Sequence, residues 1–98
     1  MSVQVVAVVT ARAGSEDVVR QAFLGIVAAT RQEPGCLSYS LSESTSAPGT
    51  FVSVEEWSDP SDLDAHMSAP HVQSALGALG SELAGPPAIH LLKPLDVQ

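Results

Sequence analysis

The sequence is poor in the residues on which several classes of function depend. Only four of its 98 residues are Lys or Arg, against eleven Asp and Glu, so the formal net charge is −7. Nucleic acids and anionic membranes are bound mainly through Lys and Arg. No apolar run approaches the roughly 18 residues that span a bilayer. We therefore expect neither nucleic acid nor a membrane as a partner.

Cysteine is almost absent, since Cys36 is the only one. One cysteine excludes a disulfide within the chain, and the first residues, MSVQVVAVVTAR, lack a basic segment followed by a cleavage site. The expected location is the cytoplasm. Walker loops and dinucleotide-binding fingerprints are also absent, which agrees with an expectation of no cofactor.

Apolar residues are abundant, at 45% of the chain. A length of 98 residues indicates a single domain over residues 1–98. A domain of this size buries roughly 60 to 65% of the surface of its unfolded chain, so association with a second copy would add stability. A homodimer is therefore expected.

Hydrophobic periodicity and turn residues divide the chain into alternating strands and helices. Pro34 and Gly35 end the first helix by Glu33, and Asp59 and Ser68 are the predicted caps of two later helices. The predicted strands are 3–12, 36–44, 51–57 and 88–95, and the predicted helices are 15–33, 58–67 and 68–84.

This order, β-α-β-β-α-β, predicts an α+β, ferredoxin-like fold with a four-stranded antiparallel sheet and helices on one face. The first strand is apolar on both faces, whereas a sheet covered on one side alternates apolar with polar residues. We therefore expect two copies to pack their sheets face to face as a dimeric α/β barrel, with a pocket where each sheet meets its helices.

The third strand carries the candidate chemistry, because side chains two residues apart share a face. We expect Val52 and Val54 to face the helices, and the alternate residues to face the region between the two sheets. A carboxylate beside an indole in a partly dry cavity can accept a proton. The alternative is structural, with the carboxylate paired to a donor and the indole packed at the dimer interface. The residues of this second face are Phe51, Ser53, Glu55 and Trp57.

Two histidines, His66 and His71, flank a helix break at residues 68–70. Imidazole exchanges protons near neutral pH, so either could act as a base, and His66 is expected closer to Glu55. A hydrogen-bonded structural role is the alternative for each. The two histidines with Glu55 could also hold a metal, but a spacing of five residues is not the i, i+4 pair of a helical metal site. We therefore expect no metal.

Three strings, RQEPGCLSY at 31–39, FVSVEEW at 51–57 and DAHMSAPHV at 64–72, together resemble the antibiotic biosynthesis monooxygenase family of dimeric α/β barrels. The resemblance implies that O2 oxidises a small aromatic such as a quinol or anthrone without flavin or metal. Haem-degrading members of the superfamily share Trp57, but residues 73–76 here contain no histidine for the iron. Where anthrone-type members have asparagine, this chain has Ser53.

The sequence therefore predicts a homodimeric, cofactor-free monooxygenase acting on a small aromatic substrate. The alternative is a dimeric small-molecule-binding or stress-associated barrel without turnover. The tyrosine hydroxyl at position 39 could bind a substrate oxygen, although a core role is open to it as well. The predicted catalytic residues are Glu55, His66 and Trp57, and the predicted substrate-binding residues are Tyr39, Phe51, Ser53, Phe23 and His71.

Overall fold

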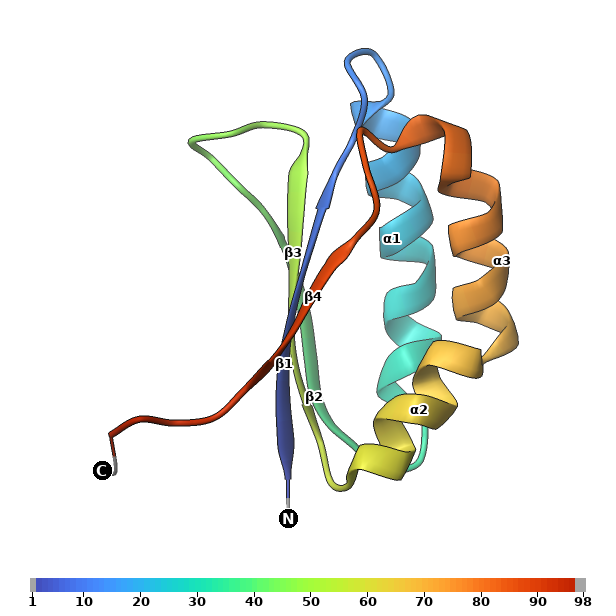
Figure 1. Ribbon diagram of the computed structural model, residues 1–98. Coiled ribbons are helices and arrows are strands. Elements are labelled where there is room, and N and C mark those ends of the chain that lie inside the picture. Colours follow the sequence, from blue (N-terminus) through green and yellow to red (C-terminus); the bar gives the residue numbers. More distant parts are fainter. Residues whose placement is uncertain (1, 97–98) are drawn as a thin grey trace.

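Four antiparallel strands form one sheet, in the order β2-β3-β1-β4 (Figure 1). This computed structural model describes residues 2–96. The elements follow the predicted β-α-β-β-α-β order, with the second helical segment divided in two, which confirms the ferredoxin-like α+β fold. In chain order they are β1 Val3–Thr10, α1 Glu16–Arg31, β2 Cys36–Glu43, β3 Thr50–Trp57, α2 Pro60–Ser68, α3 Pro70–Leu79, the 3-10 turn η1 Gly80–Glu82, and β4 Ala88–Leu92.

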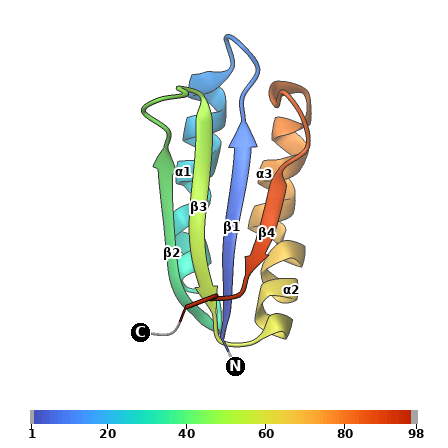
Figure 2. The same ribbon diagram turned by 60° about the vertical axis from the view of Figure 1, so that its left-hand side comes forward.

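The helices α1, α2 and α3 all lie on one side of the sheet, as Figures 1 and 2 show. The predicted apolar stripe of α1 faces the sheet, since Val19, Phe23, Ile26 and Thr30 are its buried residues. None of the helices within residues 2–96 combines the length and the apolar character needed to cross a membrane.

The helix ends agree only in part with their predicted caps. Asp59 caps α2 as predicted, because its carboxylate accepts a hydrogen bond from the backbone N–H of Ser61 at 3.0 Å. Ser15 precedes α1, but its hydroxyl accepts no hydrogen bond from the first turn of the helix and instead donates to the carboxylate of Glu82. The prediction for Ser68 was wrong, since this residue ends α2 and its hydroxyl donates to the carbonyl of Asp64.

The prediction of which face of β3 meets the helices was wrong. Phe51, Ser53, Glu55 and Trp57 are all buried beneath the helices, and Val54 on the opposite face is 51% exposed. The large aromatic side chains at 51 and 57 have more apolar surface to bury than valine does, so they take the core side. Valine is compatible with either face of a strand. The candidate site therefore lies inside each chain, between sheet and helices.

The opposite face of the sheet is free of helices, and we call it the open face (Figure 2). Glu56 is the only Asp, Glu, Lys or Arg residue that the four strands place on this face. A bulge between Cys36 and Ser38 changes the predicted alternation in β2 and leaves Leu37 56% exposed. The pairing registers place the following residues on the open face: Gln4, Val6, Val8, Thr10, Ser38, Ser40, Ser42, Thr50, Val52, Val54, Glu56, Ala88, His90 and Leu92.

Candidate active site

A cavity of about 70 Å3 lies between the covered face of the sheet and the helices. All residues of β4 are exposed, so the cavity, which Ile89 helps to line, is least covered at this edge of the sheet. The polar side chains at its wall are Tyr39, Ser53, Glu55 and His66, and the apolar wall comprises Ala7, Val9, Phe23, Ile26, Leu41, Phe51, Met67, Val72, Ala75, Leu76, Pro87 and Ile89. The cavity is therefore an apolar chamber with a few polar groups, as in small-molecule sites.

Glu55 is a buried carboxylate whose two oxygens both accept hydrogen bonds. The hydroxyl of Ser53 donates to Oε2 at 2.7 Å, and the indole N–H of Trp57 donates to Oε1 at 2.9 Å. All three residues belong to β3 and alternate along one face, so the strand itself supplies both donors. A buried carboxylate without partners would be costly, and these two bonds allow Glu55 to remain in the core.

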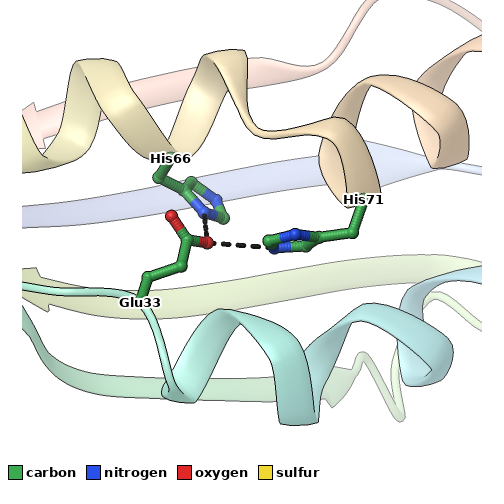
Figure 3. A group of neighbouring side chains, drawn as sticks. All are labelled: Glu33, His66 and His71. Atoms are coloured by element: carbon green, nitrogen blue, oxygen red, sulfur yellow. Dashed lines mark hydrogen bonds and ion pairs between the residues drawn. The ribbon is translucent and has the colours of Figure 1, made fainter.

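His66 lies deeper than any other histidine of the described chain, with only 5% of its side chain exposed. Its Nδ1 is 2.7 Å from Oε2 of Glu33, and His71 places its Nε2 3.0 Å from the same oxygen (Figure 3). The His66 ring also packs against the indole of Trp57, with the centroids 4.7 Å apart. Within residues 2–96, no side chain or backbone group forms a hydrogen bond with Nε2 of His66, so this nitrogen is available to a ligand in the cavity.

The break between α2 and α3 brings the two histidines together. In an uninterrupted helix, residues five apart point about 140° away from each other. Here Ala69 is extended, with φ −63° and ψ 141°, as expected for a residue before proline, and Pro70 starts a new helix. The chain thus changes direction between His66 and His71, and both rings reach Glu33.

The turn after α1 positions Glu33. Its N–H donates to the carbonyl of Thr30 at 3.1 Å, and its carbonyl accepts from the N–H of Cys36 at 3.1 Å. Gly35 has φ 81°, a left-handed conformation that glycine adopts without strain, and a side chain there would collide with Asp62 of α2. The Glu-Pro-Gly turn therefore packs closely against α2, the helix that carries His66.

Burial raises the pKa of Tyr39 to about 12, and the nearby charge of Glu55 adds to the shift. Both effects disfavour the phenolate form. Tyr39 therefore keeps its proton at neutral pH and can donate a hydrogen bond into the cavity. Its ring lies beside His66, with the centroids 6.0 Å apart.

Alkaline titration should reveal this shift directly, because Tyr39 is the only tyrosine. We expect the phenolate absorbance near 295 nm to rise with a midpoint near pH 12 in the folded protein and near pH 10 after unfolding. The unfolded chain releases this proton first, so the stability contributed by Tyr39 is complete below pH 10 and is lost between pH 10 and 12. A midpoint near pH 10 in the folded protein would contradict the burial of the hydroxyl.

Cys36 is partly buried, and burial raises the pKa of its thiol, with the charges of Glu33 and Glu55 acting in the same direction. A thiol reacts as a nucleophile only in its thiolate form. The surroundings of Cys36 therefore oppose a nucleophilic role.

The structure brings together most, but not all, of the predicted site residues. Trp57 is 0% exposed and lies behind the wall, and His71 reaches Glu33 outside the cavity. The metal grouping considered above, and set aside there, had Glu55 beside the two histidines, whereas in the structure it is Glu33 that lies beside them. Sequence reasoning missed Glu33, whose only signal was an acidic residue in a tight turn. The predicted residues that line the cavity are Phe23, Tyr39, Phe51, Ser53, Glu55 and His66.

Comparisons with known proteins agree with this architecture. The chain is 33% identical over 94 residues to "Putative monooxygenase Rv0793" of Mycobacterium tuberculosis, covering 96% of this chain and 92% of that protein. The structure of Rv0793 matches with a TM-score of 0.90 over 99% of this chain and 98% of the other, at 32% identity. A crystal structure described as antibiotic biosynthesis monooxygenase matches with a TM-score of 0.89 and 29% identity, over 98% and 100% of the two chains.

The pattern of one family, described as antibiotic biosynthesis monooxygenase, matches residues 2–78. This segment includes strands β1 to β3, the Glu33 turn, His66 and His71. The chain therefore belongs to the antibiotic biosynthesis monooxygenase family.

Proposed function

We propose that this protein oxidises a small phenolic or quinol-like aromatic with O2, without a cofactor. One observation carries the proposal: His66 lines an apolar cavity while Glu33 engages its Nδ1, which leaves Nε2 for the substrate. A carboxylate that accepts from Nδ1–H holds the imidazole in the tautomer whose Nε2 can accept a proton. The same arrangement of carboxylate and histidine orients general bases in many enzymes.

The chemistry needs a base and a dry chamber. His66 Nε2 takes the phenolic proton, and the resulting phenolate gives one electron to O2. The superoxide and the aryloxyl radical then join through a new C–O bond, and His66 returns the proton to the peroxide. Loss of the ring C–H proton breaks the O–O bond, so one oxygen atom becomes a carbonyl and the other leaves in water. The water carries one hydrogen from the hydroxyl and one from the ring carbon.

The other polar residues have supporting parts in this proposal. Tyr39 stays protonated and donates to the phenolate oxygen as charge develops, which is the kind of preorganised donor that stabilises an anionic transition state. Glu55 is a weaker candidate for the base than His66, because both of its oxygens already accept hydrogen bonds. We assign Glu55 and Trp57 to holding the wall of the cavity beside His66.

Oxygen consumption with a panel of quinols, naphthols and anthrones tests the proposed function. With 18O2, we expect the product to carry one labelled atom and the other to appear in water. If no panel member is oxidised above the rate without protein, the oxygenase proposal fails.

Two observations favour the second candidate, a binding barrel without turnover. A cavity of about 70 Å3 is smaller than the roughly 300 Å3 at which ligand pockets begin, and Trp57 is fully packed. Under this alternative, panel compounds bind and are released unchanged. Under the proposed function, the cavity enlarges when an aromatic substrate enters at the β4 edge.

Leu76 is the residue we expect to limit substrate size. Leu76 and Pro87 line both the cavity and a second hollow beside it, so their side chains separate the two. Leu76→Ala should join these spaces and raise kcat/KM for a tricyclic anthrone at least about tenfold relative to a monocyclic quinol, as methylene-sized changes in apolar pockets do. Leu24→Ala, an exposed position on α1, is the matched control. An unchanged ratio would show that Leu76 does not limit entry.

We also propose that the open face joins two copies of the chain about a two-fold axis. The protein has an excess of acidic residues, so two copies repel each other over most of their surfaces. The strands of the open face contribute only one carboxylate, Glu56, among valine, serine and other uncharged residues. This face therefore allows close approach with little like-charge repulsion, and its apolar groups gain from burial.

Light scattering or sedimentation tests this association. We expect the mass of two chains, and we expect Val54→Asp to weaken the dimer at least about tenfold by placing like charges on both sides of the interface. Val18→Asp is the matched control, because Val18 and Val54 are 53% and 51% exposed, and Val18 lies on α1. A wild-type protein that stays at the mass of one chain at high concentration would rule out this interface.

A further inference from the structure

Glu33, His66 and His71 form a cluster with more donor atoms than the proposed oxygenase chemistry uses (Figure 3). The proposed reaction needs Glu33 and His66, but it gives no part to His71. The three ligand atoms all lie within 4.8 Å of one another. We propose that this cluster is a reversible binding site for a divalent transition-metal cation of the Zn2+ class.

The donor set selects the class of cation. Two imidazole nitrogens and one carboxylate oxygen suit Zn2+ and its neighbours, whereas Mg2+ and Ca2+ prefer oxygen ligands. Ligands of a tetrahedral Zn2+ stand roughly 3.3 Å apart, given metal–ligand distances of about 2.0–2.1 Å. The present separations of 2.7 and 3.0 Å from Glu33 Oε2 to the two imidazole nitrogens need only a small expansion to admit the ion.

The setting of the cluster also suits a cation. The side chains of Glu33 and His66 are 12% and 5% exposed, and that of His71 is 27% exposed, so His71 marks the route from solvent. Each residue comes from a different segment: the turn after α1, the end of α2 and the start of α3. Because these segments are fixed by packing, the three ligands are already assembled before the ion arrives.

Cation binding would change the tautomer of His66. An ion on Nδ1 leaves the ring proton on Nε2, so the nitrogen that faces the cavity becomes a donor and can no longer take a proton. The ion would also remove Glu33 from its role of accepting from Nδ1–H. This consequence rests on the proposed function, and it predicts that Zn2+ inhibits oxygenation and that a chelator restores it.

Calorimetric titration of the untagged, chelator-treated full chain with Zn2+ tests the site without any substrate. We expect one ion per chain, no comparable binding of Mg2+, and a melting temperature that rises with Zn2+. His71→Ala should weaken Zn2+ binding at least about tenfold, because loss of an outer-shell partner alone costs 10–100-fold.

Two further variants complete the test. Glu33→Gln should also weaken Zn2+ binding at least about tenfold. If His71→Ala does not fold, Glu33→Gln is the ligand variant that tests the site. His90→Ala is the matched control, because His90 lies on β4 on the open face, opposite the cluster, and light scattering must give this variant the same mass as the wild type. The site is refuted if Zn2+ does not saturate at one ion per chain, if both ligand variants bind like the wild type, or if His90→Ala loses binding.

The two proposals can fail separately. Saturable Zn2+ binding that depends on His71, in a protein that oxidises no panel compound, would support the metal site and reject the oxygenase. Oxygenase activity insensitive to Zn2+, in a protein with no saturable binding, would reject the metal site alone. If the protein is active, the rate of each variant in Zn2+ is divided by the rate of the same variant without Zn2+. On this scale, His71→Ala should require at least about tenfold more Zn2+ than the wild type for half inhibition.

Discussion

Replacing His66 with asparagine should lower kcat for oxygen uptake by about 10²–10⁴-fold, the range that a positioned general base contributes. The amide nitrogen of asparagine can still donate to Glu33 from near the place of Nδ1, but nothing replaces Nε2. The variant therefore removes the base while keeping the hydrogen bond that Glu33 accepts. Initial rates of oxygen consumption, measured against substrate concentration, separate kcat from KM.

The control for this prediction is His90→Asn, which makes the same change on the open face of the sheet; with the same mass as the wild type in light scattering, it should react within twofold of the wild-type rate. Because the His66 ring packs against Trp57, urea unfolding of His66→Asn must show that the variant is folded under assay conditions. A folded His66→Asn protein with more than a tenth of the wild-type kcat would remove His66 from the role of base.

Replacing Trp57 with alanine should destabilise the protein by about 3–5 kcal/mol, as for other fully buried aromatic side chains. Trp57 is 0% exposed and packs in one cluster with Val5 and Leu63, joining β1, β3 and α2. Its indole N–H also donates to Glu55. Truncation therefore creates a cavity and removes a donor from a buried carboxylate.

Trp57→Phe keeps an aromatic ring, so it leaves a smaller cavity than Trp57→Ala while it also loses the N–H donor. We expect a loss of about 1–3 kcal/mol, the usual cost of removing the partner of a buried polar group. Chemical denaturation of the wild type and both variants, with unfolding slopes compared, gives these values. A Trp57→Phe protein as stable as the wild type would show that the bond to Glu55 contributes nothing measurable to stability.

The element order was predictable because the patterns along the chain are strong. Valine-rich β1, the stripe of α1 and the Asp59-Pro60 start of α2 each indicate one local structure, and the structure has them. The face of β3 was not predictable by the same reasoning. Valine fits either side of a sheet, and what fixes the face is the volume of Phe51 and Trp57, a property of packing and not of periodicity.

The cavity residues of β3 could be grouped from the sequence, because alternate residues share a face whichever way the strand turns. The Glu33 cluster could not. Glu33 and His66 are 33 positions apart in the chain, and the two histidines are at a spacing that separates them on a regular helix. Only the extended Ala69 and the tight Glu-Pro-Gly turn bring these three side chains together, and neither feature has a periodic signal.

The central claim is that a substrate hydroxyl binds to Nε2 of His66 inside the cavity. Its most direct test is long-range 1H–15N NMR of the three histidines during titration with a quinol under anaerobic conditions, where turnover cannot occur. We predict a saturable change in the Nε2 shift of His66, with the signals of His90 unchanged. Saturable binding of the quinol, seen elsewhere in the spectrum, with Nε2 of His66 unmoved would contradict the account.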